Sequence, residues 1–331
     1  MLNIYEQFKK IEKNEKENKA FNVISIPSTG HKLGISSEGY PKFFVSTKKS
    51  LESPGNIFLE LLCVEYNQHC TVIEDCKNVQ SGFFSIITLR SNEDTLQVYF
   101  IEIFKLALLK LSQAPTTKEL SIEVEKIITI FSALNKTPKK DIQGVWAELL
   151  VIEKSLNPEI MVSAWHDQNE AKYDFTMGRD KIEVKSTSGE IRKHRFSLDQ
   201  LNPSQNSQLL IASVIVRESA QCNNGLSIKD LYERILFRLK TIDSQLKLYS
   251  TLVAAIGDNY KKWNALFFDY VSAVDTLSFY KVEDVPRINK SDVPPLVSEV
   301  VFSSDLSAIE EKKISSANFD YMDSILYRSL F

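Results

Sequence analysis

One helical stretch followed by four stretches of alternating polarity, between about residues 137 and 220, constrains the fold of this chain most. The helix is expected over TPKKDIQGVWAELLVIEKSL, with Pro138 near its start and Pro158 after its end. The stretches IMVSAW, KYDFTM, DKIEVKS and QLLIASVIVRES then show the two-residue period of β-strands. A helix placed before several short strands, the last of them strongly apolar, predicts an α/β core.

The flanking sequence predicts two further parts, which fits a chain of 331 residues, longer than one compact core usually needs. Up to about residue 90, short runs rich in β-branched and aromatic residues alternate with turns, and two helical stretches follow. After the core, two helices precede the strand-like ALFFDYVSAV, SFYKVE and VSEVVFS. We therefore expect a β-rich and helical module at residues 1–136, the core at 137–220, and an α+β region at 221–331 that completes or extends it.

Composition and charge exclude several classes of protein. The chain has no run of about 18 apolar residues that could span a membrane, and its charged start lacks the apolar segment of a secretory signal, so we expect a cytoplasmic protein. Cys63, His69, Cys70 and Cys76 lie close together but lack the paired C-x-x-C spacing of a zinc ribbon, so a zinc site is not favoured. The net charge of −3 excludes a general polycationic coat, which leaves a local basic cleft for any phosphate ligand.

The stretch KYDFTMGRDKIEVKSTSG, residues 172–189, is the strongest candidate for chemistry. Side chains alternate along a strand, so Glu183 and Lys185 project from the same face. Asp174 ends the preceding apolar run, and a hairpin turning through MGRD brings it across from them, because antiparallel strands lie about 5 Å apart. Mg²⁺ prefers a few carboxylate oxygens and keeps several waters, so Asp174 and Glu183 predict a magnesium site that a substrate phosphate completes.

Residues before and after the hairpin extend this candidate site. Glu148 lies on the helix that leads into the hairpin and can reach the metal from a second direction, with Gly144 one turn earlier allowing close approach of the backbone. Downstream, a dense group of basic residues offers the local positive charge that a phosphate backbone requires. These predicted DNA contacts are Arg192, Lys193, His194 and Arg195.

Taken in chain order, these residues resemble the PD-(D/E)XK nuclease superfamily, which includes restriction endonucleases and DNA-repair nucleases. The combination WAELLVIE, YDF, EVKS and HRFSLDQL is similar to bacterial proteins known as PD-(D/E)XK motif proteins, which are linked to restriction and phage-defence gene clusters. The resemblance implies a mixed central sheet flanked by helices, with Asp174 and Glu183 as metal ligands and Lys185 as the catalytic lysine. It also implies that Glu148 is the helix acid and Gln200 an accessory polar group. Tyr173 stands where the first motif often has proline, a position at which many members vary.

The resemblance implies a Mg²⁺-dependent endonuclease, with Mn²⁺ able to substitute, that hydrolyses double-stranded DNA in restriction or phage defence. Cutting both strands needs two sites, so we expect a homodimer or a subunit of a defence complex with methyltransferase or ATPase partners. Two alternatives stay open at this point. The chain can be a non-catalytic DNA-binding or assembly subunit, or a nuclease acting on RNA or on repair intermediates.

Individual residues also have simpler explanations. Glu148 can be a solvated helix charge paired with Lys154 or Lys140, and Gln200 a turn residue in SLDQLNP. A histidine in a basic loop, such as His194, is more often solvated than bound to phosphate. Trp146 and Trp165 fall in apolar patterns and are expected in the core. The order of the motifs, rather than any one residue, carries the nuclease interpretation.

Overall fold

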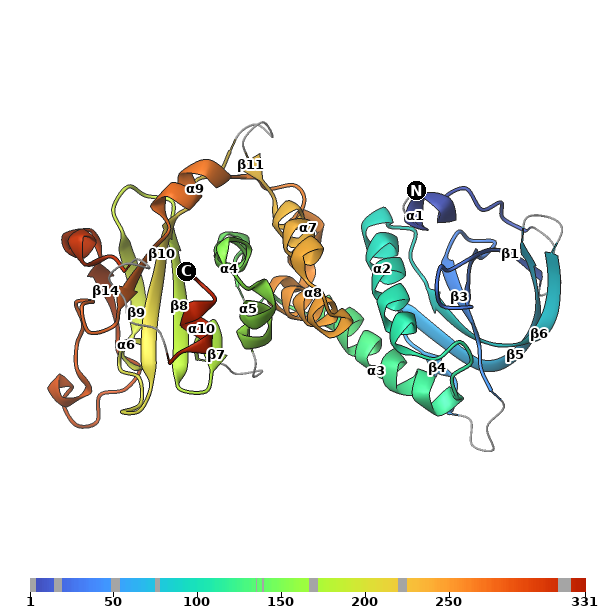
Figure 1. The fold of residues 1–331 in the computed structure, drawn as a ribbon, viewed down its shortest axis with the longest axis horizontal. Helices are drawn as coiled ribbons and strands as arrows, with labels where there is room; N and C mark the ends of the chain where they lie inside the picture. The colour runs from blue at the N-terminus through green and yellow to red at the C-terminus, as the bar shows by residue number, and fades with distance from the viewer. Residues whose placement is uncertain are drawn as a thin grey trace. The chain divides into compact units, whose positions relative to one another are not determined.

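The computed structural model describes residues 4–14, 20–48, 54–74, 78–134, 136–138, 140–166, 172–219, 225–314 and 323–331 (Figure 1). The chain divides into two compact units, residues 1–133 and 134–331. Helices and strands occur in both units, and the main sheet of the second unit is mixed, which confirms the α/β class. No helix in the described ranges is long and apolar enough to cross a membrane.

The first unit is a small β-barrel with helices. Its six-stranded sheet has the order β1-β2-β3-β6-β5-β4, and a parallel pairing of β1 with β5 closes the sheet on itself (Figure 1). Phe43, on β3, packs against Phe100 and Phe104 of the first long helix, with ring centroids 5.3 and 4.6 Å apart. The elements are α1 (Ile4–Phe8), β1 (Ala20–Ser25), β2 (Lys32–Ile35), β3 (Pro41–Ser46), β4 (Ile57–Phe58), β5 (Leu62–Glu74), β6 (Asn78–Leu89), α2 (Asp94–Lys110) and α3 (Thr117–Ala133).

The second unit is built on a four-stranded mixed sheet with the order β13-β10-β8-β7. Strands β8 and β10 are parallel, and the two outer pairings are antiparallel. Helices α4 and α5 lie on one side of the sheet, and the β9–β14 ribbon lies on the other (Figure 1). The elements up to β10 are α4 (Ile142–Lys154), α5 (Pro158–Ala164), β7 (Phe175–Met177), β8 (Asp180–Thr187), β9 (Lys193–Ser197), α6 (Leu198–Leu201) and β10 (Gln208–Ile215).

The chain after residue 220 belongs to this same unit. It supplies strand β13 to the main sheet and strand β14 to the ribbon. Its elements are β11 (Gly225–Leu226), α7 (Ile228–Arg238), α8 (Ile242–Ile256), η1 (Gly257–Lys262), β12 (Phe268–Asp269), α9 (Tyr270–Thr276), β13 (Ser278–Lys281), η2 (Lys290–Asp292), β14 (Val301–Asp305), η3 (Ser307–Lys312) and α10 (Ile325–Arg328).

Local sequence explains the elements that frame the sheet centre. Asp141 caps α4 by accepting a hydrogen bond from the Gly144 amide at 2.6 Å. Gly178 has φ of +57° in the β7–β8 turn, a conformation that glycine adopts without steric cost. Strand β10 is apolar because it pairs on both sides and is buried along all but its first residue.

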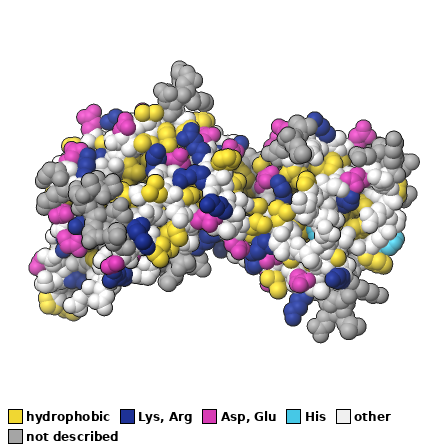
Figure 2. Space-filling view, viewed as in Figure 1, with side chains coloured by type: hydrophobic (Ala, Val, Ile, Leu, Met, Phe, Trp, Pro, Cys, Tyr) yellow, Lys and Arg dark blue, Asp and Glu magenta, His cyan; other side chains and the backbone are white. Residues whose placement is uncertain are grey.

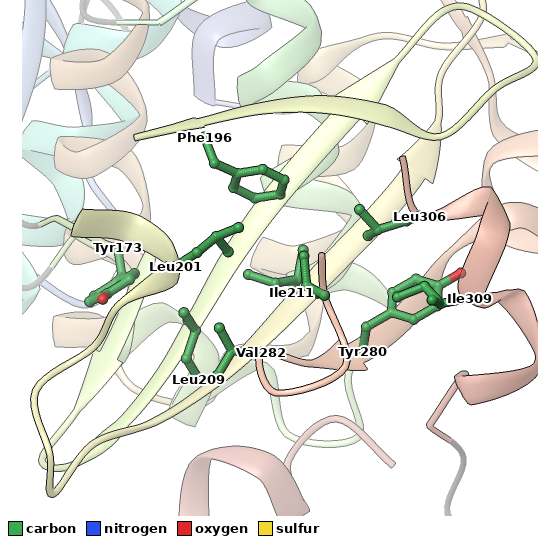
Figure 3. Close-up of a cluster of buried hydrophobic side chains, with 10 residues drawn as sticks. Tyr173, Phe196, Leu201, Leu209, Ile211, Tyr280, Val282, Leu306 and Ile309 are labelled. Carbon is green, nitrogen blue, oxygen red and sulfur yellow. The ribbon is translucent and has the colours of Figure 1, made fainter. Parts of the chain in front are cut away.

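A cluster of buried hydrophobic side chains joins the sheet to the ribbon and α6 (Figure 3). The cluster includes Ile211 of β10, Tyr280 of β13 and Phe196 of β9. Tyr173 and Leu201 also belong to it, and each is the chain neighbour of a predicted site residue. The apolar core therefore fixes the backbone directly beside Asp174 and Gln200.

Two expected elements are wrong in kind or length. IMVSAW is not a strand, because most of it lies in α5, which begins with Pro158 at its first position and Asn157 as its cap. ALFFDYVSAV forms only the two-residue β12 before continuing into α9. Short apolar runs fit a buried helix and a strand equally well, so their period alone does not decide between them.

Candidate metal and active site

The hairpin of β7 and β8 brings the three motif residues together. Asp174 directly precedes β7, and its Oδ2 accepts a hydrogen bond from the Val184 amide of β8 at 2.7 Å. Glu183 and Lys185 flank Val184 on β8, and the Lys185 Nζ lies 2.7 Å from the Glu183 Oε1. The expected convergence of two carboxylates and one lysine is therefore present.

One carboxylate oxygen of Glu183 has polar partners, and the other has none among the described residues. Its side chain is almost fully buried, and the Gln200 Nε2 donates to its Oε1 at 2.6 Å. Gln200 lies on α6, where it also forms a capping box with Ser197, so its amide is oriented by the helix start. The second carboxylate oxygen, Oε2, is buried and has no hydrogen-bond partner among the described residues. A buried carboxylate oxygen without a donor is costly, and a proton, a water or a metal ion can each remove that cost.

Glu148 reaches the same place from α4. It is 2% exposed, so it is not the solvated helix charge considered above. Lys140 does pair with it, with Nζ 2.5 Å from the Glu148 Oε1, and the same ammonium also pairs with the Asp174 Oδ1. On the other oxygen, the Trp165 Nε1–H donates to Oε2 at 2.7 Å, and the His166 Nε2 lies 2.9 Å away.

Burial and neighbouring charges shift the pKa values of the three buried carboxyl groups. Burial, and then the charge of Asp174, raise the pKa of Glu183 to about 8. Burial and the charge of Glu148 raise the pKa of Asp174. For Glu148, burial is outweighed by Lys140 and His166, which hold its pKa below the ordinary value. With its pKa at about 8, Glu183 is largely protonated at neutral pH, and a bound cation would favour its ionised form.

The residues present fit a divalent cation. Glu148, His166 and Asp174 each offer one ligand atom, and these atoms lie within 4.8 Å of one another. Carboxylate oxygens and an imidazole nitrogen are established metal ligands. Glu183, whose Oε2 is unpartnered among the described residues, is the chain neighbour of Val184, whose amide binds Asp174.

Two of the four predicted DNA contacts lie inside the fold. Arg192 is 5% exposed and donates to Ser213 O and Oγ at 2.9 and 3.0 Å and to the Thr276 carbonyl. His194 is buried against the Ser213 Oγ at 2.8 Å, and burial followed by the nearby Lys185 charge lowers its pKa to about 4. Neither side chain is available to a phosphate backbone. The strand alternates, so Lys193 and Arg195 are the exposed pair.

The structure also places the cysteine and tryptophan residues that stood out in the sequence. Cys63 is half-buried and Cys70 is buried, both on β5, and within the described ranges neither joins a cluster of metal-binding side chains. Cys76 and Cys222 lie outside the described residues. Trp146 and Trp165 are fully buried, as core residues are.

Sequence reasoning assigned no role in the site to His166 or Trp165, and named Lys140 only as a possible partner of Glu148. Trp165 and His166 follow α5, whose sequence has the alternating period of a strand, so the sequence does not indicate that they lie beside Glu148. The isolated bridge between Trp165 and Phe175 sets this segment beside Asp174. His166 precedes Asp174 by eight residues in the chain. That spacing indicates a shared site only once the bridge between Trp165 and Phe175 is known.

The fold and the site define a PD-(D/E)XK nuclease-like α/β protein. Over residues 4–307 the chain matches the model of the family described as "Putative PD-(D/E)XK family member, (DUF4420)", and it belongs to that family. No curated protein and no solved structure matches the chain.

Proposed function

We propose that this protein is a Mg²⁺- or Mn²⁺-dependent endonuclease that hydrolyses phosphodiester bonds of double-stranded DNA in bacterial restriction or phage defence. The observation that carries the proposal is the convergence of Asp174, Glu183 and Lys185 on one hairpin, joined by Glu148 from α4 and Gln200 from α6. Family membership supports the nuclease class, and the substrate and cellular role belong to the proposal.

Glu148, Asp174 and Glu183 would hold the metal ion. When bound, a divalent ion lowers the pKa of a coordinated water and offsets the charge that develops on the phosphate during hydrolysis. The acidic residues themselves keep their geometry through contacts to Val184, Trp165 and Gln200. A preformed ligand set of this kind spends little binding energy on ordering side chains.

Lys185 is the residue that would place a positive charge beside the scissile phosphate. Its Nζ is fixed by the Glu183 Oε1 and lies 5.2 Å from the centroid of the Phe196 ring, and both contacts restrict its rotamers. The side chain remains partly exposed, at 21%, so a phosphate oxygen can approach it. In this position the ammonium can donate to the scissile phosphate and orient the attacking water.

Because the net charge of the chain is −3, DNA would be bound by a local group of basic side chains. Lys193 and Arg195 project from the exposed face of β9, and Phe196, on the buried face of the same strand, lies against Lys185. On the face seen in Figure 2, Lys and Arg side chains are interspersed with acidic and hydrophobic ones rather than merged into one basic surface. Cleavage of both strands would require a second copy or a partner subunit.

Cleavage of supercoiled plasmid tests the proposal. We expect nicking and linearisation that require Mg²⁺ or Mn²⁺, stop in EDTA, and fall by at least about a hundredfold in Lys185→Ala and Asp174→Ala. Lys181→Ala is the matched control, because Lys181 lies on the same strand but bonds the Gly178 carbonyl near the turn. Its cleavage rate should equal that of the wild type.

The same assay separates the alternatives. Competition among duplex DNA, single-stranded DNA and RNA at one stated salt concentration shows which substrate the site prefers. A wild type that binds DNA but cleaves neither unmodified nor methylated plasmid, with or without metal, would contradict the proposal and favour the non-catalytic subunit.

A further inference from the structure

We propose that His166 is a nitrogen ligand of the metal, which makes the site selective for a transition-metal ion such as Mn²⁺ over Mg²⁺. This inference rests on the proposed function, since it takes Glu148 and Asp174 as the other ligands. It adds a residue outside the D-x8-E-x-K motif and names the class of ion.

The fold delivers the His166 ring to the acidic residues by backbone pairing. Trp165 forms a bridge with Phe175, and the His166 amide donates to the Asp174 carbonyl at 2.9 Å. The backbone of His166 has φ of +43°, a left-handed conformation that is uncommon for a residue with a side chain. Its Nε2 then lies 2.9 Å from the Glu148 Oε2. His166 and Asp174 are therefore held side by side, although eight residues separate them.

The position between Glu148 and Asp174 that an ion would take is occupied by the Lys140 ammonium. Trp165 donates to Oε2 and fixes the carboxylate plane, while Oε1 faces Lys140. The Lys140 ammonium lies between the Glu148 Oε1 and the Asp174 Oδ1, where a cation has two oxygen ligands. Its side chain is 30% exposed and has a route to solvent, so an arriving ion can displace it.

Glu183 provides an independent sign of a missing ligand. Its Oε2 is buried and unpartnered in the described chain, although Oε1 of the same carboxylate has two donors. Val184, the chain neighbour of Glu183, donates its amide to the Asp174 Oδ2 at 2.7 Å, which places Glu183 close to Asp174. A buried carboxylate oxygen beside the cluster of Glu148, His166 and Asp174 is therefore left without a hydrogen bond among the described residues.

The donor set indicates the kind of ion. Mg²⁺ is a hard cation that prefers oxygen ligands in near-ideal octahedral geometry. Mn²⁺ shares the preference of Mg²⁺ for carboxylate oxygens, but as a first-row transition ion it also accepts imidazole nitrogen, which Mg²⁺ binds poorly. One nitrogen added to the carboxylate oxygens therefore shifts preference toward Mn²⁺ while still permitting Mg²⁺ to bind.

Titration of the full-length protein with MnCl₂ and MgCl₂, followed by calorimetry, gives the first test. We expect the wild type to bind Mn²⁺ at least roughly tenfold more tightly than Mg²⁺, and His166→Asn to lose that preference while keeping Mg²⁺ affinity within a few-fold. Asparagine tolerates the left-handed backbone, so this variant should fold. His69→Asn, at an exposed histidine of β5, is the control and should behave like the wild type.

Pulsed electron paramagnetic resonance of bound Mn²⁺ gives the second test, which no purely structural role would satisfy. Directly coordinated imidazole modulates the Mn²⁺ echo through ¹⁴N, so the wild type should show that modulation and His166→Asn should not. Bound Mn²⁺ without ¹⁴N modulation in the wild type overturns this inference and leaves the proposed nuclease untouched. Failure of either ion to bind, together with an inert plasmid assay, overturns both.

Discussion

At the scale of single residues, Lys140 is the counterion that allows two acids to be buried together. Its Nζ pairs with Glu148 and Asp174, and their charges outweigh burial and raise the pKa of Lys140, so it stays protonated. Removing one partner of a buried ion pair leaves an uncompensated charge, which is far more destabilising than replacing the whole pair. The role of Lys140 can therefore be measured through stability.

We expect Lys140→Met to lower the free energy of unfolding by about 3 kcal/mol in EDTA, because Glu148 and Asp174 then repel without a cation. Saturating Mn²⁺ should restore most of the loss, since the ion takes the vacated position. Chemical denaturation with and without metal measures both effects. Equal losses with and without Mn²⁺ would show that Lys140 and the ion do not share a position.

A surface pair provides the matched control for this experiment. Lys229 and Glu233 lie one turn apart on α7, 3.7 Å from each other and well exposed. Lys229→Met should change stability by less than about 0.5 kcal/mol, with no dependence on metal, because exposed ion pairs contribute little.

At the scale of elements, the alternation of strand β9 gives the basic residues of IRKHRF two different roles, one buried and one exposed, which the sequence alone does not distinguish. Arg192 and His194 bond Ser213 of β10 and tie the loop and ribbon to the sheet, whereas Lys193 and Arg195 point outward. Four basic residues in a row thus split into a buried structural pair and an exposed pair. Only the second can contribute to counterion release on DNA.

This division predicts opposite effects for neighbouring substitutions. The double variant Lys193→Gln, Arg195→Gln should keep its stability but bind duplex DNA more weakly, with the salt slope reduced by roughly 0.9 for each phosphate that the protein no longer neutralises. Arg192→Met should instead lower the free energy of unfolding by about 3 kcal/mol, because the Ser213 and Thr276 carbonyls lose a charged donor. Thermal melting and fluorescence anisotropy at several salt concentrations measure the two. A double variant with unchanged salt dependence would remove β9 from the DNA interface.

At the scale of the whole molecule, two units with separate cores share one chain. The core of the first includes the barrel cluster around Phe44 and Phe84, and that of the second the cluster around Ile211 and Tyr280. Every candidate ligand of the metal belongs to the second unit. Metal binding should therefore stabilise that unit specifically.

Scanning calorimetry of the full chain should resolve two unfolding transitions. Adding Mn²⁺ should raise the midpoint of one transition by several degrees and leave the other unchanged, as expected for a ligand that binds one folded unit. Asp174→Asn should abolish the shift of that transition. A single transition that moves as a whole would show that the two units unfold cooperatively.

The amino-acid sequence was sufficient to predict the α/β class and the geometry of the hairpin. Asp174, Glu183 and Lys185 converge as expected because strand alternation and a glycine turn are local rules, which the stretch of residues 172–189 contains in full. Family membership was also recognisable, since the order of motifs lies in the chain itself.

The surroundings of these residues depend on the folded chain. Whether Arg192 faces DNA or Ser213 depends on which side of β9 the ribbon buries, and the sequence of basic residues does not encode that. The Lys140 side chain reaches Asp174 across 34 positions of the chain, and the His166 ring reaches Glu148 across 18, so only the folded chain brings these groups together. Burial sets the pKa values of these side chains, and pairing between separate segments sets the positions of the ligand atoms. Both arise only when the chain folds.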